Sequence, residues 1–567
     1  MISVSNKEWS ERIFDINRVD KCSQDNDFSQ ILSKLIISRK FNDEEIHSIN
    51  NPDSIIFSNV FRFNIDFKNA VKLVSDAIDR KEKICIFGDY DVDGSCATAL
   101  IIKFFKSIDH PHFYLIPDRE KDGYGLNVKL VKKIIKEQPK LIIMVDNGSN
   151  STKEINLFKE NKIDALVIDH HQINEPFPKA NVIINPKKNN GYIKNDYMCA
   201  TLLTFFFIDL LKDKIATNFH LNDYLIYPLM ATICDVMPLR NVNRFLAIYA
   251  LKKFDLKKIN SIKIIFDLLK NDKKISIDDF GFLIGPILNA GGRLDDSNLA
   301  VKLLSSNNLN EIKSVGKKLI HLNNKRKILE DRILNDIDYS KIKNENKNVI
   351  LYYSSNIKEG LIGIIASRLK DLYNKPTIVL TDSNNFLKGS ARSIFGFDIG
   401  LAIKNAFDYN LILRGGGHKM AAGFSIEKKK LKSFDDFINN YYKKVADKIN
   451  IKSFYYDAKI SGSALNKFLF DDIKKLKPFG SGNPNPLFLI EKLKIKKAKV
   501  LNDKHISNIF VSKNGLSIRG ISFNAKKESF SKYLLNYKKE INVVGYLSEN
   551  FWNNKKTLQL VVRDLII

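Results

Sequence analysis

The amino-acid sequence predicts an α/β protein: a parallel-sheet domain and a smaller α/β domain joined by a long helix, followed by a C-terminal β-barrel. Short apolar runs alternate with helix-like segments over residues 83–185, which is typical of parallel strands with crossover helices. The same alternation returns after residue 348, and closely spaced strands follow residue 455. At about 100 to 200 residues per domain, the 567 residues are enough for several folding units.

Composition excludes several classes of protein. Hydrophobic residues make up 44% of the chain, which is too many for a disordered, collagen-like or small disulfide-stapled protein. The most apolar run, residues 202–211, has about half of the ~20 residues that a membrane-spanning helix needs, and it contains Asp209. The five cysteines have no CxxC spacing, and the first residues lack the apolar core of a secretory signal. We therefore expect a cytoplasmic protein with no membrane partner.

The chain carries a formal charge of +27, from 91 Lys and Arg against 64 Asp and Glu. Such a charge attracts polyanions, including nucleic acids. Lysine outnumbers arginine, however, and Asn and Ile are abundant, as in proteins encoded by AT-rich genomes. The charge by itself therefore fits a solvated, compositionally biased surface as well as it fits a nucleic-acid-binding one.

Four apolar runs in the first α/β region are predicted to be buried strands: residues 84–87, 141–145, 165–168 and 182–184. An aspartate follows each of the first three runs directly or within two residues: Asp89, Asp146 and Asp169. The carboxyl ends of parallel strands meet at one edge of a sheet, where open α/β sheets bind their ligands. The sequence therefore predicts that carboxylates gather at this edge.

The rest of the chain follows similar patterns. Spaced apolar residues and many charges over residues 299–337, with no proline, predict one long connecting helix. A strand over 349–353, a helix over 361–372 and a strand over 377–380 predict the second α/β domain. Five later strands fit an OB-like barrel, and a β-sandwich nearly as well: 487–495, 506–511, 516–523, 541–547 and 557–562.

The most informative segment is Gly88-Asp89-Tyr90-Asp91-Val92-Asp93-Gly94, which directly follows a predicted buried strand. Three aspartates this close repel one another unless cations compensate their charge. The alternatives are an exposed Asp-rich turn or a calcium loop. An EF-hand loop would need a Glu at position 12 and a flanking helix pair, which the sequence lacks. The segment therefore predicts a metal site.

Other segments add ligands of the same kind: Asp146-Asn147-Gly148, Asp169-His170-His171 and Asp235. Each alone would more often be a turn, a structural histidine pair or a helix cap. Together, Asp89, Asp91, Asp146, His170 and Asp235 offer carboxylates and one imidazole without a thiolate, which suits Mn²⁺ or Mg²⁺. Two such ions about 3.5 to 4 Å apart activate water for phosphoester hydrolysis. We therefore expect two ions and phosphoester cleavage.

These motifs resemble those of the DHH phosphoesterases, and within that family those of the RecJ group of single-strand-specific 5′ exonucleases. Further segments support the resemblance: 118–125, 288–296, 388–393, 415–423 and 478–484. It runs from about residue 50 to the end of the chain. Two places depart from the pattern of the family. Tyr197-Met198-Cys199-Ala200 stands where a small, Gly-containing stretch is usual, and an extra glycine precedes Arg293.

The resemblance implies a role for each matching residue. Asp89, Asp91, Asp146, His170 and Asp235 would ligate the metal ions. His171 would orient substrate, ligate or assist proton transfer, and Asp93 would orient the ligands or neighbouring amides, which completes the catalytic set. Five residues are expected to bind the scissile strand and its 5′-terminal phosphate: Arg119, Arg293, Ser390, Arg392 and His418.

The resemblance also implies a domain division: an N-terminal segment (1–50), a DHH domain (51–250), a helical connector (251–345), a DHHA1 domain (346–450) and an OB-like nucleic-acid-binding domain (451–567). The implied activity is metal-dependent 5′ to 3′ hydrolysis of single-stranded DNA in recombination and repair, by a monomer. Its partners would be single-stranded DNA, a helicase and a single-strand-binding protein.

Two rival functions stay open at this point. A DHH phosphodiesterase acting on short oligonucleotides or cyclic dinucleotides shares the ligand set, but the length and the extra barrel argue against it. A non-catalytic single-strand-binding scaffold shares the fold, but the chain retains all five candidate ligands.

Overall fold

The computed structural model describes residues 1–52, 57–123, 125–188, 197–270, 275–383, 385–446, 453–552 and 555–567. The chain divides into two units. We call Phe57–Pro238 with Phe245–Ile449 the α/β unit, and Met1–Ile56 with Leu239–Arg244 and Asn450–Ile567 the barrel unit. Within the ranges given above, no helix combines the length and the apolar character needed to cross a membrane.

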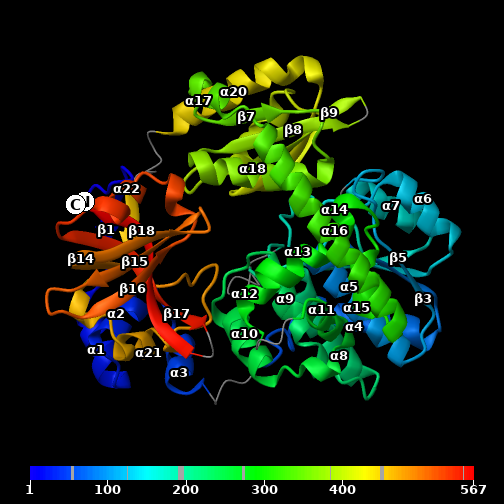
Figure 1. Ribbon diagram of the computed structural model, residues 1–567. Helices are drawn as coiled ribbons and strands as arrows, with labels where there is room; N and C mark the ends of the chain where they lie inside the picture. The colour runs from blue at the N-terminus through cyan, green and yellow to red at the C-terminus, as the bar shows by residue number, and fades with distance from the viewer. Residues whose placement is uncertain are drawn as a thin grey trace. The chain divides into compact units, whose positions relative to one another are not determined.

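The first domain of the α/β unit contains a five-stranded sheet in the order β3-β2-β4-β5-β6 (Figure 1). All of its pairings are parallel, as the sequence predicts. One edge strand, β3, is not predicted because its four residues are only partly buried and form no apolar run. The strands are β2 (Ile84–Phe87), β3 (His112–Leu115), β4 (Leu141–Val145), β5 (Asp164–Ile168) and β6 (Val182–Ile184).

Side chains that alternate along the strands define the two faces of this sheet. Cys85 and Phe87 of β2 and Ile142 and Met144 of β4 join one buried cluster with residues of α6 and α7. Helix α8 contacts β4 and β5, and it packs on α5 and α4. The helices are α4 (Ile65–Asp79), α5 (Val92–Ser107), α6 (Val128–Lys136), α7 (Thr152–Glu160) and α8 (Ala200–Lys214).

A helical region connects the two α/β domains. The predicted long connecting helix is present as α16 (Leu309–Asp336), but it does not begin at residue 299, because the chain turns extended at Ser306 and residues 299–305 form a separate short helix. Asn308 then begins a new helix, since its side chain accepts the backbone amides of Asn310 and Glu311. The elements are α9 (Ile226–Cys234), α10 (Asn241–Lys253), α11 (Asn260–Leu268), α12 (Ile277–Asp279), the π-helical turn η5 (Phe280–Ile284), α13 (Gly285–Leu288), α14 (Ala290–Leu294), α15 (Leu299–Ser305), α16 (Leu309–Asp336) and α17 (Tyr339–Glu345), with 3-10 turns η3 (Leu221–Tyr224) and η4 (Leu256–Lys258).

The second α/β domain contains a mixed sheet in the order β10-β11-β9-β8-β7. Strands β7 and β8 are parallel and the others pair antiparallel, and α18 contacts β8 and β9. The elements are β7 (Ile350–Tyr353), α18 (Glu359–Tyr373), β8 (Thr377–Ser383), β9 (Phe386–Arg392), α19 (Ile399–Asp408), β10 (Arg414–His418), β11 (Ala421–Ile426), η6 (Lys428–Lys430) and α20 (Leu431–Ala446).

The barrel unit contains a closed five-stranded barrel, because β14 pairs with both β15 and β17. This closure decides for a barrel against a β-sandwich. Strand β14 is long and has an irregularity between Ile495 and Lys497, which helps it to serve two partners. The barrel strands are β14 (Phe488–Leu501), β15 (His505–Val511), β16 (Ser517–Ser522), β17 (Ile541–Trp552) and β18 (Lys555–Ile566), accompanied by β13 (Ala458–Ser461), η7 (Gly462–Ala464), α21 (Lys467–Lys475), η8 (Ala525–Lys527) and α22 (Ser531–Asn536).

The N-terminal segment, which the sequence left without a fold, packs into this barrel unit, where blue and red ribbons meet in Figure 1. Trp9 donates its indole N–H to Asp564 at 3.0 Å, and buried Arg39 pairs with buried Asp457 at 2.9 Å. The segment comprises β1 (Glu8–Glu11), parallel to β12 (Ser453–Tyr456), and α1 (Ile16–Asn26), α2 (Gln30–Ser38) and α3 (Asp43–Asn50).

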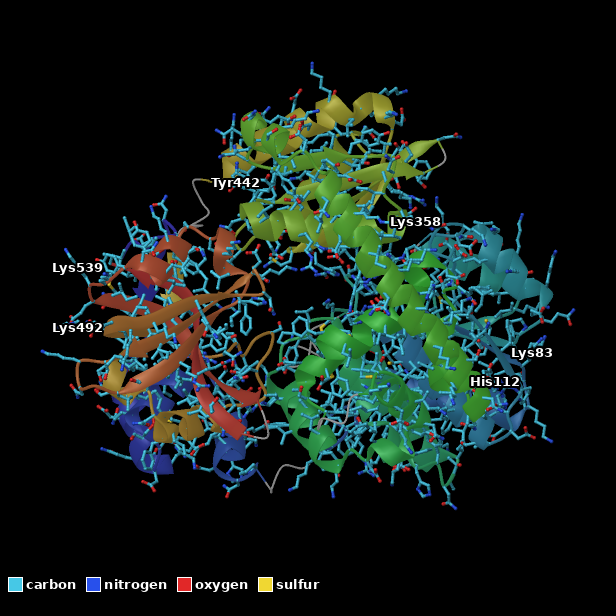
Figure 2. All side chains as sticks on the ribbon, in the orientation of Figure 1. Lys83, His112, Lys358, Tyr442, Lys492 and Lys539 are labelled. Atoms are coloured by element: carbon cyan, nitrogen blue, oxygen red, sulfur yellow. The ribbon has the colours of Figure 1, made fainter. Side chains whose placement is uncertain are left out.

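Much of the positive charge lies on the surface. Lys492 and Lys539 of the barrel unit, for example, are exposed (Figure 2). The large charge of the chain is thus in part a property of its solvated surface.

Candidate active site

The Asp-rich segment forms a tight turn between β2 and α5. A Cβ atom on Gly88 would lie 2.0 Å from Thr98 Oγ1, and one on Gly94 would lie 2.6 Å from the Asp89 amide nitrogen. Only glycine fits at either position. Asp91 is the N-cap of α5, and its Oδ1 accepts the Gly94 amide at 3.1 Å.

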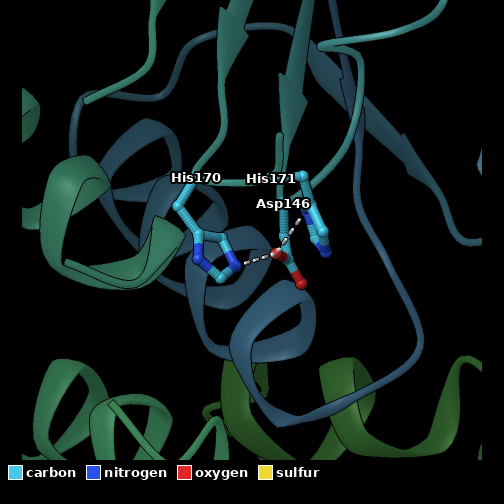
Figure 3. Close-up of side chains that lie close together, drawn as sticks. All are labelled: Asp146, His170 and His171. Atoms are coloured by element: carbon cyan, nitrogen blue, oxygen red, sulfur yellow. Dashed lines mark ion pairs between the residues drawn. The ribbon is translucent and has the colours of Figure 1, made fainter. Parts of the chain in front are cut away.

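Asp146 and His170 lie at the ends of the neighbouring strands (Figure 3). Asp146 follows β4 with a left-handed φ of 61°, a conformation that aspartate adopts more readily than most non-glycine residues. His170 Nε2 lies 3.2 Å from Asp146 Oδ1 and 3.3 Å from Asp235 Oδ2. His171 Nδ1 lies 3.8 Å from the same Asp146 oxygen. Strand ends β4 and β5 and the end of α9 therefore meet at one point.

The seven predicted catalytic residues fall into three overlapping groups. In each group, one candidate ligand atom per residue lies within 4.8 Å of the others. Asp146 and His170 each belong to two groups, so neighbouring cation positions would share ligands. The groups are Asp89 with Asp91 and Asp146, Asp93 with His170 and Asp235, and Asp146 with His170 and His171.

The electrostatics of this acidic cluster fit a divalent cation. Burial and the charge of Asp91 raise the pKa of Asp89 to about 8. Burial and neighbouring aspartates raise the pKa of Asp146 and Asp235 well above the ordinary value. Burial lowers the pKa of His170, and among the described residues its Nε2 makes no hydrogen bond. Crowded carboxylates beside a neutral imidazole nitrogen are a suitable donor set for Mn²⁺ or Mg²⁺.

Asp93 has a second set of contacts. Its carboxylate accepts the backbone amides of Ala200 and Thr201, each at 2.7 Å, at the start of α8. Its Oδ2 also lies 3.6 Å from His170 Nε2. Ala200, the last residue of the unusual sequence Tyr197–Ala200, donates one of these two hydrogen bonds to Asp93. Asp93 therefore joins the acidic cluster to the first turn of α8.

Asp169 is a site residue whose role the sequence did not predict. Its Oδ1 accepts the His170 amide at 2.7 Å and lies 2.8 Å from His171 Nδ1, and its Oδ2 accepts the Ser149 amide at 3.0 Å. Burial opposes its ionisation, but the charge and hydrogen bond of His171 lower the pKa of Asp169. Burial alone would lower the pKa of His171, but Asp169, Asp235 and Asp89 raise it to about 9. The position directly before the histidine pair, at a strand end, is the signal that could have indicated this role.

The predicted arginines form a second cluster beside the first. The Arg119 guanidinium lies 4.2 Å from the ring centroid of Tyr90, whose amide donates to Asp89. Burial and the charges of Arg119, Arg326 and Arg392 lower the pKa of Arg293 to about 9. The sequence did not single out Arg326, because it lies within the regular pattern of α16.

Ser390 and Arg392 reach this arginine cluster from β9. A Cβ atom on Gly363 of α18 would lie 3.0 Å from Arg392 Nη2 and 3.1 Å from Ser390 Oγ. Glycine at this position leaves room for both side chains. Arg293 donates to the Gly360 carbonyl at 3.0 Å, so the same helix start holds it in place.

His418 brings the second α/β domain to the acidic cluster. It lies on β10, and its ring stacks on His171 with centroids 6.0 Å apart and an interplanar angle of 24°. Burial and the charges of Lys187 and His171 lower the pKa of His418. The predicted metal ligands and the predicted strand-binding residues therefore lie in one continuous region.

Three family models match the chain: the DHH family N-terminal domain over residues 83–232, the DHHA1 domain over 346–444 and the RecJ OB domain over 456–564. The fold and the site thus define the class, and the chain belongs to the DHH family. The third domain and the relatives described next place it in the RecJ group of that family.

Two curated relatives extend over most of the chain. The single-stranded-DNA-specific exonuclease RecJ of Haemophilus influenzae is 29% identical over 517 residues, which are 87% of this chain and 89% of that protein. The protein of the same name from Escherichia coli is 27% identical over 523 residues, which are 88% and 90% of the two chains. A crystal structure of Thermus thermophilus RecJ with Mn²⁺ has a TM-score of 0.82 at 22% identity, covering 99% of this chain and 79% of that one. This likeness shows that the fold is shared.

Proposed function

We propose that the protein is a metal-dependent exonuclease that hydrolyses single-stranded DNA from its 5′ end. The observation that carries this proposal is that two clusters of opposite charge, the arginine cluster partly buried, are linked through one residue, Tyr90. The acidic cluster suits divalent cations, and the arginine cluster suits a phosphate. Tyr90 lies between them, since its amide contacts Asp89 and its ring contacts Arg119.

Each residue of the acidic cluster has a role in this proposal. Asp89, Asp91, Asp146, His170 and Asp235 would hold Mn²⁺ or Mg²⁺, in two neighbouring positions. Divalent cations in such a site lower the pKa of water and offset the charge of phosphate oxygens. His171, whose pKa Asp169 raises through its charge and hydrogen bond, would donate a hydrogen bond or a proton to the leaving oxygen.

The arginine cluster would select the end of the strand. Arg119, Arg293 and Arg392, with Ser390, would bind the 5′-terminal phosphate, because guanidinium groups bind phosphate in a bidentate manner. A terminal phosphate held beside the acidic cluster would place the first phosphodiester bonds at the reacting groups. His418 would contact the strand from the second α/β domain, since it stacks on His171. This arrangement supports 5′ to 3′ removal of nucleotides.

The remaining assignments belong to the same proposal. The OB barrel would bind the strand, as such barrels do, through basic and stacking side chains. The division into domains 1–50, 51–250, 251–345, 346–450 and 451–567 stays a prediction, and we propose it as part of the same assignment. We propose a monomer that acts in the cytoplasm in DNA recombination and repair, with a helicase and a single-strand-binding protein as partners.

One assay separates this proposal from its rivals. A single strand with a 5′ phosphate is labelled at its 3′ end and incubated with and without Mn²⁺ or Mg²⁺, in parallel with dinucleotide substrates. We expect stepwise 5′ shortening that requires metal and is lost in Asp91→Ala. Cleavage of dinucleotides alone would favour a phosphodiesterase of short substrates. Tight strand binding without turnover would favour a non-catalytic scaffold.

A further inference from the structure

A separate cavity of about 400 Å³, open to solvent and with Lys106, Ser107 and Asn307 exposed on its wall, lies at the end of α5 opposite to the acidic cluster. Helix α5 begins beside Asp91 and has 16 residues, so at about 1.5 Å per residue the cavity is roughly 24 Å from that end. The volume is in the range of small-molecule sites, about 300 to 1,000 Å³. Residues of its wall include Lys103, Lys106, Ser107, Phe219, Tyr224 and Asn307.

Two lysines of this wall have no acidic partner. Half-buried Lys103 donates to Asn307 Oδ1 at 3.1 Å, and Lys106 lies 3.4 Å from the Ser305 carbonyl oxygen. Neither lysine forms an ion pair with any residue that the structure describes. The acidic residue of the wall, Asp223, is already paired with Lys258 at 2.7 Å.

The protonated form of Lys103 is less favoured than that of Lys106. Burial and the neighbouring charge of Lys106 lower the pKa of Lys103 to about 8. Lys106 lies in the last turn of α5, where the helix dipole favours a cation, so it needs no further explanation. The position of Lys103 does need an explanation, because a half-buried ammonium group beside another cation is normally paired with an anion. A bound anion would supply the missing charge.

Aromatic side chains form another part of the wall. Phe219 and Tyr224 stack with ring centroids 5.4 Å apart and an interplanar angle of 9°. The Lys103 ammonium lies 5.5 Å from the centroid of the Tyr224 ring. The cavity therefore combines a cationic side, an aromatic side formed by two rings that stack on each other, and a hydroxyl group from Ser107.

We propose that this cavity binds a nucleoside phosphate, with its phosphate on Lys103 and Lys106 and its base against Phe219 and Tyr224. A ligand of this class matches the size of the cavity, the two lysines without an acidic partner and the aromatic side together. The inference does not depend on the proposed exonuclease activity, because the residues of the two sites are different.

Calorimetric titration of the full chain in the presence of a chelator tests the proposal. The probes are AMP, adenosine and inorganic phosphate, which separate the contribution of the base from that of the phosphate. We expect AMP to bind more tightly than either fragment. Lys103→Gln with Lys106→Gln should weaken AMP binding by at least about tenfold, the effect of losing one charged hydrogen bond. The matched control changes two exposed lysines of α6, Lys132→Gln with Lys133→Gln, and should bind AMP as the parent does.

Two results would overturn the proposal. One is the absence of AMP binding to the parent protein. The other is binding that survives the cavity variant but is lost in Arg392→Met, which would assign the nucleotide to the arginine cluster.

Proton uptake gives a second readout that does not depend on the affinity of the variants. At pH 8, a bound phosphate should raise the pKa of Lys103, so binding should take up protons and its heat should depend on the buffer. His220, Asp223, Tyr224 and Lys106 also face the cavity, so Lys103→Gln is the control that must abolish this dependence. A buffer dependence that persists in Lys103→Gln would contradict the role of Lys103.

Discussion

The acidic cluster and the arginine cluster of the α/β unit are two neighbouring regions in which charges of the same sign lie close together, negative in one and positive in the other. In both, like charges are buried together, and in both the pKa values move toward the neutral form: Asp89 to about 8 and Arg293 to about 9. The acidic cluster can take up protons near neutral pH, whereas the arginines stay charged there. The comparison indicates that the acidic cluster can offset its charge with protons or with cations, whereas a bound anion is what would offset the charge of the arginine cluster at neutral pH.

Removal of a shared carboxylate should have the largest effect. Asp146 belongs to two of the three ligand groups, so we expect Asp146→Asn to reduce nuclease activity more than about 100-fold. Loss of an outer partner of a metal ligand already costs about 10- to 100-fold, and Asp146 is itself a candidate ligand. The measurement is the rate of single-strand degradation at saturating Mn²⁺, with exposed Asp408→Asn as the matched control. Activity within tenfold of the parent would exclude Asp146 from the metal site.

The arginine cluster should show a smaller effect that depends on the substrate. We expect Arg392→Met to raise KM about 10- to 100-fold for strands with a 5′ phosphate, the range for a charged hydrogen bond. Strands with a 5′ hydroxyl should be affected much less. Exposed Arg332→Met on α16 is the matched control. Equal losses on both substrates would mean that Arg392 does not contact the terminal phosphate.

Substitution of Asp169, which holds His171, should have the next largest effect on activity. Asp169→Asn keeps the shape of the side chain but removes the charge that sustains His171 as a cation, so we expect about a 10-fold loss of kcat, at the lower end of the effect of outer partners. The pH profile of kcat should also shift, because the pKa of His171 should fall from about 9. An unchanged profile would show that His171 does not titrate in the reaction.

The smallest expected effect is on the pH dependence of the free energy of unfolding, which the acidic cluster should change and the arginine cluster should not. Buried carboxylates with raised pKa values bind more protons in the folded protein than in the unfolded chain. The free energy of unfolding of the metal-free protein should therefore fall as pH rises from about 4 toward the Asp89 pKa of about 8. Saturating Mn²⁺ should remove most of this slope, which thermal unfolding at several pH values can measure. Arg392→Met should leave the slope unchanged, since arginines do not titrate in this range.

Much of the site could be predicted from the sequence because its ligands follow local patterns. Asp89, Asp146 and His170 each follow an apolar run that is long enough to define a buried strand, and parallel strands end at one edge. The sequence offered Asp235 as a candidate carboxylate ligand, but its position beside His170 depends on how α9 packs, which the sequence pattern alone does not show.

Other features of the fold and the site depend on contacts between distant residues, and the spacing of apolar residues along the sequence does not predict such contacts. Edge strand β3 has no apolar run, and the break before α16 depends on one capping side chain, Asn308. The N-terminal segment acquires its place through Trp9 and Asp564, at opposite ends of the chain. The role of Asp169 depends on the direction of its side chain relative to His171.

The pairing of β1 with β12 has a consequence for biosynthesis. Arg12 and Asp457, which form an ion pair beside these strands, are separated by 445 residues. At about 5 to 20 residues per second, a ribosome would need roughly 20 to 90 seconds to deliver the partner. During that time, the apolar faces of α1, α2 and α3 have no barrel to pack against. We expect ribosome-bound fragments that end before the barrel to expose this region to protease and to recruit chaperones.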